Sequence, residues 1–523
     1  MATSWRNPVA ALYRRPLYAL SIVVVLLILV PVIQTVFLAI TGDHQQVASA
    51  LRGTDIPNLL GTTLLVTAIV TPLCGIFGVA GAWLVERTDL AWRKFWALLL
   101  VAPIAIPLFV TSYAWSGLGS VGNGFGGAIA IVAFSYYPIV FLLCSASLRN
   151  MDPSPEEAAR CLGSGPGIVF WRVVMPQLRP ALLGGLLIVA LDTLVEFDAF
   201  VALHLSLFIT NIYDQYRISF SASGAAVLSC ISIVTCILVL AVEARLRGNR
   251  NYVSTTNGAR RPPARYQLGG WKLPMLLLML VFSAVAVGVP VGALVSWYHQ
   301  STPEALAAAP ASTSNLAGAT LTSLALGLCA SLVSLLLAMP VAMLTTSRRG
   351  VVAGLLERAT YLSFALPDLV AAVALAYLSS HVFGGALQGD VVVLIFAYAI
   401  LFCPIAVLAL RILFSQIDPK LDDVARSLGL GAVRTLLRVR LPLARPGIAA
   451  GAVLVFVFVL SDLSTTQVLL PAGLTTLGTQ FWTDAHAVAF GAAAPYAAAL
   501  MVIAAAATYV LMSRFAKLRD GAV

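Results

Sequence analysis

Long apolar stretches dominate this chain and decide what it can fold into. Twelve mostly apolar segments stand out, each long enough to cross a bilayer core of about 30 Å as a helix. Helices are expected because, in lipid, every backbone polar group must be satisfied within its own segment. The predicted spans are 17–40, 59–84, 95–116, 126–148, 177–200, 223–243, 273–297, 316–345, 351–379, 390–414, 443–465 and 489–513. The sequence therefore predicts an all-α polytopic membrane protein.

Charged residues are scarce, and their positions define an orientation. Only 10% of the side chains are charged and 60% are hydrophobic, a composition that excludes a soluble globular fold. With both termini in the cytoplasm, all of the 32 Lys and Arg residues except Arg52 and Arg217 fall in inner segments. The net charge of +10 then reflects topology and attraction to anionic lipid, not nucleic-acid binding. We expect a multi-pass protein of the plasma or inner membrane.

The sequence contains one internal repeat. Residues 152–185 align with residues 418–451 without a gap at a constant offset of 266, and residues 58–64 resemble residues 315–321. Both matches lie at equivalent places in two sets of six predicted spans, which gives parallel repeats. We predict a first half over 1–244, a cytoplasmic linker over 245–270 that is rich in Arg, Pro and Gly, and a second half over 271–523.

The best-matched stretch is the inner loop between the fourth and fifth spans of each half, residues 152–176 and 418–442. An Asp-Pro pair predicts the start of a short helix in each copy. Gly163 and Gly429 predict its end, because glycine readily adopts the left-handed conformation that closes many helices. A second short stretch is expected to stop near Pro176 or Pro442. We interpret the two copies as helix–turn–helix elements that dock onto a two-fold symmetric soluble partner; the alternative is ordinary loops made similar by duplication.

These loops resemble the EAA loop of binding-protein-dependent ABC importer permeases. The first copy reads Glu157-Ala158-Ala159, then Gly163 and Val173-x-Met175-Pro176; the second reads Asp423-Val424-Ala425, then Gly429 and Val439-x-Leu441-Pro442. The resemblance implies a type I importer fold of two fused six-helix permeases, each with one loop seated on a subunit of a cytoplasmic ABC ATPase dimer. The departures from Glu and Ala in the second copy indicate an asymmetric pair of contacts. The implied coupling residues are Glu156, Glu157, Ala158, Ala159, Gly163, Asp422, Asp423, Ala425 and Gly429.

Two other stretches, residues 107–115 and 211–220, resemble the iron(III) importer group of these permeases. This resemblance implies iron(III) as the substrate. The alternatives are thiamine, a phosphonate or another small solute carried by a fused permease of the same kind. A proton-coupled secondary transporter is a further alternative, but the loop after the second span lacks the glycines typical of such carriers. A membrane enzyme would need catalytic acids or metal ligands grouped in its loops.

The chain has no ATP-binding loop of its own. A phosphate-binding loop needs Gly-Lys before Ser or Thr, and none of the four lysines follows a glycine. The predicted outer loops are also too short to enclose a ligand. We therefore expect ATP hydrolysis on a separate cytoplasmic ATPase dimer and delivery of the solute by a soluble binding protein on the outer face. We expect no cofactor bound by this chain and no enzymatic activity of its own.

Acidic residues within the predicted spans are candidates for the transport path, because ionisable groups are costly inside a membrane. Asp192, Glu196 and Asp198 cluster late in the fifth span, and Asp462 aligns with Glu196 in the eleventh. Asp368 follows a proline that can open the helix of the ninth span. Carboxylates suit a hard cation such as Fe³⁺. We expect Glu196, Asp198, Asp368 and Asp462 to line the path; the alternative is that they lie at the outer interface or satisfy helix packing.

The five histidines all fall in or near predicted outer loops, but without the spacing of metal ligands. Contact with a binding protein, or no role, is therefore favoured over a metal relay for His44, His204, His299, His381 and His486.

Overall fold

Helices make up nearly all of the chain in the computed structural model. It describes residues 14–151, 153–247, 265–300, 313–347, 351–361, 363, 366–381, 389–416 and 420–519. Within these ranges an isolated β-bridge joins Thr88 to Tyr266, and the elements are otherwise helical, as predicted. The chain divides into two units. The α4 unit comprises Ser49–Phe220 and Ile231–Thr302, and the α17 unit comprises Met1–Ala48, Ser221–Cys230 and Pro303–Val523.

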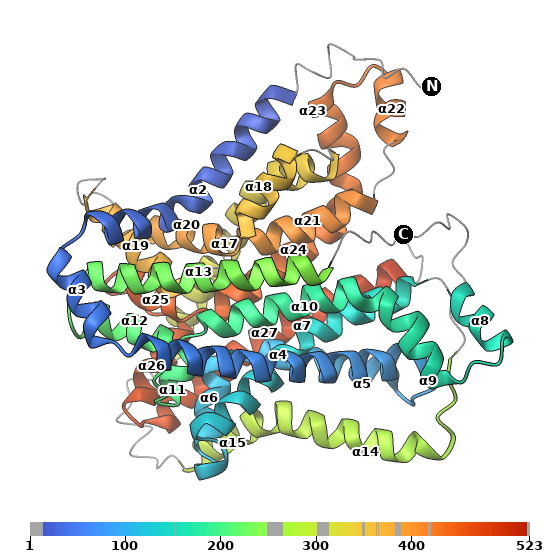
Figure 1. Ribbon diagram of the computed structural model, residues 1–523, viewed down its shortest axis with the longest axis horizontal. Coiled ribbons are helices and arrows are strands. Elements are labelled where there is room, and N and C mark those ends of the chain that lie inside the picture. Colours follow the sequence, from blue (N-terminus) through green and yellow to red (C-terminus); the bar gives the residue numbers. More distant parts are fainter. Residues whose placement is uncertain are drawn as a thin grey trace. The chain divides into compact units, whose positions relative to one another are not determined.

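The α4 unit places two short helix pairs at opposite ends of its long helices. Helices α8 and α9 lie at one end, and α11 and α12 at the other (Figure 1). In chain order the elements are α4 (Ile56–Arg87), α5 (Arg93–Val101), η1 (Ala102–Ala105), α6 (Leu108–Ser116), η2 (Gly119–Val121), α7 (Gly124–Asn150), α8 (Ser154–Cys161), α9 (Pro166–Val169), the π-helical η3 (Phe170–Val174), α10 (Met175–Val195), α11 (Asp198–Ala202), α12 (Phe208–Arg217), η4 (Gly269–Trp271), α14 (Lys272–Ser283), the π-helical η5 (Ala284–Gly288) and α15 (Val289–Gln300).

The α17 unit has a similar arrangement, with α22 and α23 at one end and α25 and α26 at the other (Figure 1). Its elements are α2 (Arg14–Thr41), α17 (Thr313–Ser347), α18 (Val351–Tyr361), α19 (Asp368–His381), α20 (Val391–Leu401), α21 (Cys403–Gln416), α22 (Lys420–Ser427), α23 (Ala432–Thr435), the π-helical η7 (Leu436–Arg440), α24 (Leu441–Ser461), α25 (Ser464–Leu469), α26 (Leu477–His486) and α27 (Phe490–Arg519). Helices α3 (His44–Gly53) and α13 (Ala222–Arg247) have residues in both units.

The first predicted span of each sequence half packs with helices of the other half. Helix α2 packs against α17, α18 and α19, whereas α14 and α15 pack against α5 and α6. Phe282 packs α14 against helices of the first sequence half. Its ring centroid lies 5.0 Å from that of Phe77 on α4 and 5.1 Å from that of Phe134 on α7. The division of the chain into two repeated halves, 1–244 and 271–523, joined by a linker over 245–270, stays a prediction. Of the linker, residues 248–264 lie outside the described part of the chain.

Not every predicted span is one continuous helix. Among the described residues, eight helices are long and apolar enough to cross a membrane, or ten if two bent pairs each count as one span. The third span bends by 88° between α5 and α6, and the tenth by 47° between α20 and α21. Shorter apolar helices, Asp368–Ser380 and Gly451–Ser461, lie in the ninth and eleventh. Prolines explain the first break and the one before α19: Pro107 and Pro367 stand just ahead of α6 and α19, and a proline removes a helix hydrogen bond.

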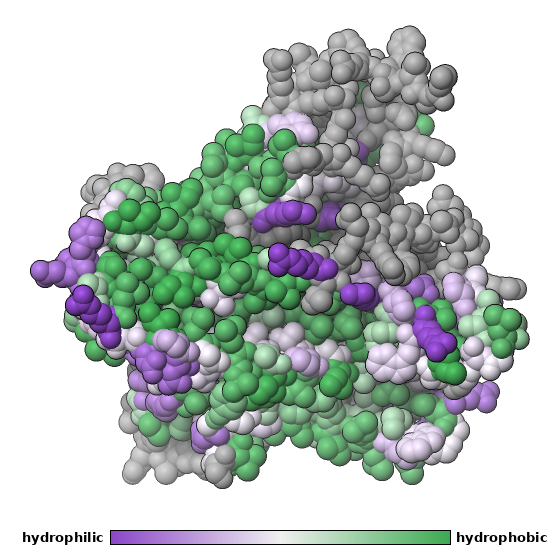
Figure 2. Space-filling view, in the orientation of Figure 1, coloured by the Kyte–Doolittle hydropathy of each residue, from purple (hydrophilic) through white to green (hydrophobic). Residues whose placement is uncertain are grey.

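The long helices expose apolar side chains along their lengths. Hydrophobic residues cover the visible surface over α2, α4 and α13 in Figure 2. The exposed apolar residues of these helices include Leu26 and Phe37 of α2, Leu65 and Ile76 of α4, and Leu238 of α13. In water such surfaces would drive association, whereas in a bilayer they face lipid tails.

Close helix packing in the α4 unit depends on Gly78, where α4 crosses α7. A β-carbon at this position would stand 2.7 Å from Cβ of Val140 and 2.8 Å from the backbone nitrogen of Phe141. In membranes, where lipid is as apolar as the side chains, such close contact between backbones is a main source of helix association.

We predict opposite effects for two glycine-to-alanine changes on α4. Gly78→Ala should destabilise the protein by about 1–3 kcal/mol through overpacking against α7. Gly61→Ala, where nothing lies within 4 Å of the new methyl group, should stabilise α4 by about 0.5–1 kcal/mol. The measurement is the unfolding free energy of the purified protein in detergent, and equal effects of the two changes would contradict the packing argument.

Candidate functional site

Two matching elbows form the candidate site, one at the end of each unit. We name α8 with the residues up to Trp171 the first elbow, and α22 with the residues up to Leu437 the second. Gly163 closes α8 at φ +81°, with the Ser164 N–H donating to the Ala159 carbonyl at 3.0 Å. Gly429 closes α22 at φ +77°, with the Leu430 N–H donating to the Ala425 carbonyl at 3.0 Å. These are the left-handed turns predicted at both glycines.

The second arm of each elbow continues into a long helix, and the predicted stop near Pro176 and Pro442 is wrong. In the first copy the helix runs from α9 through η3 into α10, and in the second from α23 through η7 into α24. The Met175 and Leu441 N–H groups donate to the carbonyls five residues earlier, Phe170 and Leu436. A π-helical turn ahead of each proline therefore carries the helix past it. Each elbow is thus joined rigidly to a long apolar helix.

Apolar side chains stand out from both elbows at equivalent positions. Leu162 is 86% exposed and Leu428 is 74% exposed, and the two align at the offset of 266. Trp171 and Leu437 form a second exposed pair at the same offset. Asp152, at the predicted start of the first elbow, lies outside the described residues; α8 begins at Ser154. Exposed apolar residues that stand beside charged ones are typical of a docking surface.

The predicted coupling residues differ in where their side chains lie. Glu157 and Ala158 are exposed, Ala159 is half-buried, and Glu156 and Ala425 are buried. Asp422 and Asp423 lie on α22, but their side chains fall outside what the structure describes. Contact of these residues with an ATPase stays a prediction.

Glu156 faces the end of α4. Its Oε1 lies 2.9 Å from Nη2 of Arg87, and the two side chains are 3% and 0% exposed. Burial raises the pKa of Glu156 above its ordinary value, and the positive charge of Arg87 acts in the opposite direction. The Nε and Nη1 groups of Arg87 have no hydrogen-bond partner among the described residues. Arg87 was expected only to mark the inner side of the membrane, so its pairing was missed; a charged pair directly at a span end was the available signal.

Arg87 belongs to a run of four residues, Glu86 to Asp89, that we call the α4 hub. Glu86 accepts hydrogen bonds from Ser145 Oγ and Arg149 Nε of α7, both at 2.6 Å. Arg87 pairs with α8, and Asp89 binds the chain on either side of η4. Neighbouring residues of the hub therefore connect α4 to three other elements.

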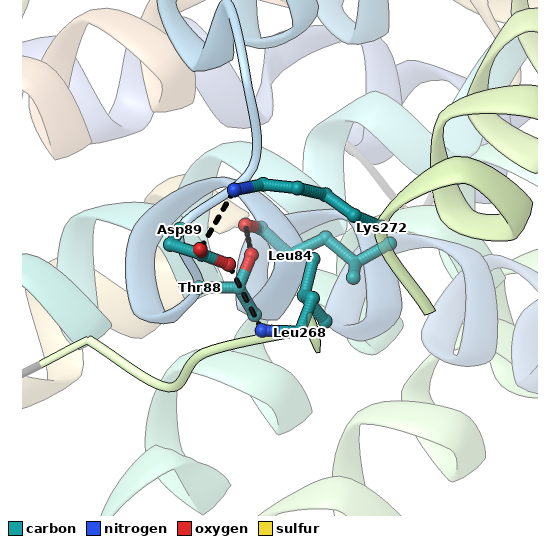
Figure 3. A network of polar contacts seen from close by, with 5 residues as sticks. All are labelled: Leu84, Thr88, Asp89, Leu268 and Lys272. Atoms are coloured by element: carbon teal, nitrogen blue, oxygen red, sulfur yellow. Dashed lines mark hydrogen bonds and ion pairs between the residues drawn. The ribbon is translucent and has the colours of Figure 1, made fainter. Parts of the chain in front are cut away.

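Asp89 ties the end of the predicted linker to α4 (Figure 3). Its Oδ1 accepts the Leu268 N–H at 2.9 Å and its Oδ2 lies 2.8 Å from Lys272 Nζ. The hydrogen bond from the Lys272 ammonium lowers the pKa of Asp89 below its ordinary value, and the hydrogen bond from the Leu268 N–H makes a smaller contribution in the same direction. The stabilisation from this lowered pKa is complete above the ordinary value of about 4 and is lost only as the pH falls through the lowered one. The tie is therefore fully formed at neutral pH.

The predicted path acids all lie at interruptions of helices. Glu196 follows α10, and its Oε1 accepts the Ala199 N–H at 3.0 Å. Asp462 follows α24, and its Oδ1 accepts the Thr465 N–H at 3.3 Å. The repeat alignment of Glu196 with Asp462 therefore extends to the same hydrogen bond. Each carboxylate therefore accepts a hydrogen bond from the first turn of a short helix.

The other two predicted path acids are Asp198, in the unit of Glu196, and Asp368, in the unit of Asp462. Asp198 is buried at the first position of α11. The Tyr136 hydroxyl donates to Glu196 Oε2 at 2.7 Å, and it also lies within hydrogen-bonding reach of Asp192. Asp368 begins α19, which packs against α25. Within the described residues, no three His, Cys, Asp or Glu side chains form a group that could hold a metal ion.

Comparison with known proteins identifies the family. The family described as binding-protein-dependent transport system inner membrane component matches residues 90–248 and 332–520. The first segment extends four residues beyond the predicted first half, and the second lies within the predicted second half. The chain belongs to this family. It is accordingly a multi-pass membrane component of a transport system that depends on a binding protein. Such permeases are not themselves enzymes, as predicted.

Individual relatives cover the chain to different extents. The Fe(3+)-transport system permease protein FbpB 2 of Haemophilus influenzae is 30% identical over 504 residues, 95% of this chain and 98% of that protein. The ferric transport system permease protein FbpB of Actinobacillus pleuropneumoniae is 23% identical over 88% of this chain and 72% of its own length. The sulfate transport system permease protein CysW of Synechocystis is 27% identical over 42% of this chain but 89% of its own length. The fused double-permease architecture fits these lengths.

We predict that Glu156→Gln destabilises the folded protein, because it leaves the buried Arg87 charge without its ion-pair partner. Removing one partner of a buried pair typically costs about 3–5 kcal/mol. Glu157→Gln, one residue further and exposed, should change the unfolding free energy by less than about 0.5 kcal/mol. Unfolding of both variants in detergent makes the comparison, and an unchanged Glu156→Gln protein would show that the pair carries no stability.

Proposed function

We propose that this chain is the membrane subunit of an ATP-driven importer that takes up iron(III) delivered by a soluble binding protein. The observation that carries the proposal is the match to an Fe(3+)-transport permease over 95% of the chain, together with two elbows of the same geometry. The proposed orientation puts both termini and both elbows in the cytoplasm, in line with the distribution of Lys and Arg.

ATP hydrolysis is assigned to a separate dimer of ATPase subunits, and this chain would bind no cofactor. Each elbow offers one exposed leucine and a second exposed apolar residue, Trp171 or Leu437, to one ATPase subunit. Since the second arm of each elbow is continuous with α10 or α24, a tilt of the elbow would move the inner end of that helix. Alternating access then follows from closing and opening the ATPase dimer.

The path is proposed to pass the carboxylates at the ends of α10 and α24. Glu196 and Asp462, with Asp198 and Asp368 nearby in their own units, would offer oxygen atoms to a hard cation. Their position at helix breaks also allows local backbone movement, since the helix ladder is already interrupted there. Capping and transport are compatible roles for the same carboxylates.

Sulfate is the second candidate substrate, because a sulfate permease resembles about half of the chain. The carboxylates of half-buried Glu196 and buried Asp198 oppose it, since a dianion near them would meet like charge in a low dielectric. Uptake of labelled sulfate that rises when these carboxylates are neutralised would favour this candidate.

We predict that the double variant Glu196→Gln, Asp462→Asn loses iron uptake by roughly tenfold or more while still assembling with the ATPase. The amides retain an oxygen that can accept the Ala199 and Thr465 N–H groups, so the caps stay and only the charge is removed. Uptake of labelled ferric ion into proteoliposomes is the measurement.

The control for this pair is Asp390→Asn, which changes a carboxylate that caps α20 in the same manner and lies outside the proposed path. Uptake should be unchanged in the control. Normal uptake in the double variant would remove both carboxylates from the path.

We predict that Leu162→Asp combined with Leu428→Asp weakens binding of the ATPase more than about tenfold, as expected for two central interface residues. Copurification of the ATPase with the tagged permease measures the effect. Leu118→Asp introduces a charge at another exposed leucine, between α6 and η2, and should leave binding unchanged. ATPase binding that survives the double change would show that the elbows are not the docking site.

A further inference from the structure

The end of the predicted linker contacts the first elbow through one side chain, Tyr266. The guanidinium carbon of Arg160, on α8, lies 4.1 Å from the centre of the Tyr266 ring. On α4, Trp83 contacts Tyr266 with ring centroids 5.3 Å apart and Phe170 of η3 with centroids 4.8 Å apart. Tyr266 therefore contacts the first arm directly and the second arm through Trp83.

The backbone of Tyr266 is held by the α4 hub. Its N–H donates to the Arg87 carbonyl at 2.8 Å, and its carbonyl accepts the Asp89 N–H at 3.1 Å, which makes the parallel bridge to Thr88. The Tyr266 hydroxyl has no hydrogen-bond partner in the part of the chain described, so the ring carries the side-chain contacts. The ring is thus fixed at the same place where Arg87 receives Glu156 of α8.

The other side of this attachment is α14. Asp89 binds Leu268 and Lys272, the latter being the first residue of α14, as Figure 3 shows. Further along, Phe282 of α14 lies among aromatic rings of α4 and α7. A displacement of α8 at Tyr266 would therefore reach the inner end of α14, the span that packs with helices of the other sequence half.

The described residues at the end of α17 do not repeat the α4 hub. At the offset that aligns Asn58 with Asn315, the positions equivalent to Glu86–Asp89 are Met343, Leu344, Thr345 and Thr346. None of these four side chains is charged. Among the residues that the structure describes, the attachment is therefore found at the first elbow.

We propose that Tyr266 is a positioning residue that clamps the first coupling helix to α4 and α14, so that movement of α8 is passed to α14 as well as to α10. This inference rests on the proposed role of the elbows in coupling. The cation–π contact with Arg160 is the part of the clamp that a single substitution can remove. Through this clamp the first elbow drives two spans, α10 and α14.

The test compares Tyr266→Leu with Tyr266→Phe in the complete transporter, reconstituted in proteoliposomes with its ATPase and with a binding protein loaded with ferric ion. The leucine variant should keep the ATPase bound and hydrolysing, but import at least about threefold less iron per ATP, the size expected for loss of a cation–π contact. The phenylalanine variant retains the ring and should match the unaltered protein. Tyr298→Leu, at an exposed tyrosine of α15, is the matched control and should also match it.

A second measurement follows the coupling helices directly, by hydrogen exchange of residues 154–163 and 420–429. Tyr266→Leu should accelerate exchange in the first segment and leave the second unchanged. Asp89→Asn, which weakens the same attachment from its other end, should act in the same direction and serves if the leucine variant does not reach the membrane.

An unchanged iron-to-ATP ratio, equal acceleration in both segments, or a phenylalanine variant as impaired as the leucine one would overturn the clamp. Failure of the proposed function looks different. In that case the unaltered protein would bind no ATPase or import no iron with ATP.

Discussion

The ion pair between Arg87 and Glu156 makes the first coupling helix part of the helical bundle. Both side chains are almost completely shielded from water, so separating them would leave two charges without solvation or partner. Helix α8 consequently cannot move away from the end of α4 as a free loop would. The adjacent hub residues extend this constraint to α7 and α14. Movement imposed on α8 is therefore shared by several helices from the outset.

A bilayer provides no water to an interrupted helix, so each break must be repaired by protein groups. The ends of α10 and α24 show how this is done. The N–H groups of Ala199 and Thr465, in the first turns of α11 and α25, find acceptors in Glu196 and Asp462. A carboxylate at such a break satisfies the backbone and also places a negative charge within the membrane region. Asp368 likewise places a carboxylate at the start of a helix, α19, directly after a proline.

The local structure of the elbows could be predicted because it depends on nearby residues. Gly163 and Gly429 end their helices through the left-handed conformation that glycine favours, and hydropathy alone located the apolar segments. The stop near Pro176 was wrong because a π-helical turn absorbed the proline, which depends on how the preceding turn packs. A proline in the sequence shows a lost hydrogen bond but not how the helix responds.

Tertiary features could not be predicted from this sequence. Arg87 was counted as one more inner positive charge, since its burial depends on Glu156 of a different helix. Tyr266 is a single aromatic residue in an Arg- and Pro-rich stretch with no periodicity to mark it. Hydropathy predicts that α2 and α14 enter the membrane, but it carries no information about which helices they pack against. The roles of Glu196 and Asp462 in a path remain proposals for the same reason.

The exchanged position of α2 has a consequence for biosynthesis. Its packing partners begin at α17, about 270 residues later in the chain, so at a synthesis rate of about 5–20 residues per second α2 waits for tens of seconds before they exist. During that interval the helices that contact α2 most in the folded protein have not yet been made. It is the most apolar of the eight long apolar helices described, which suits a segment that enters the bilayer well before the ribosome has delivered the helices it will join.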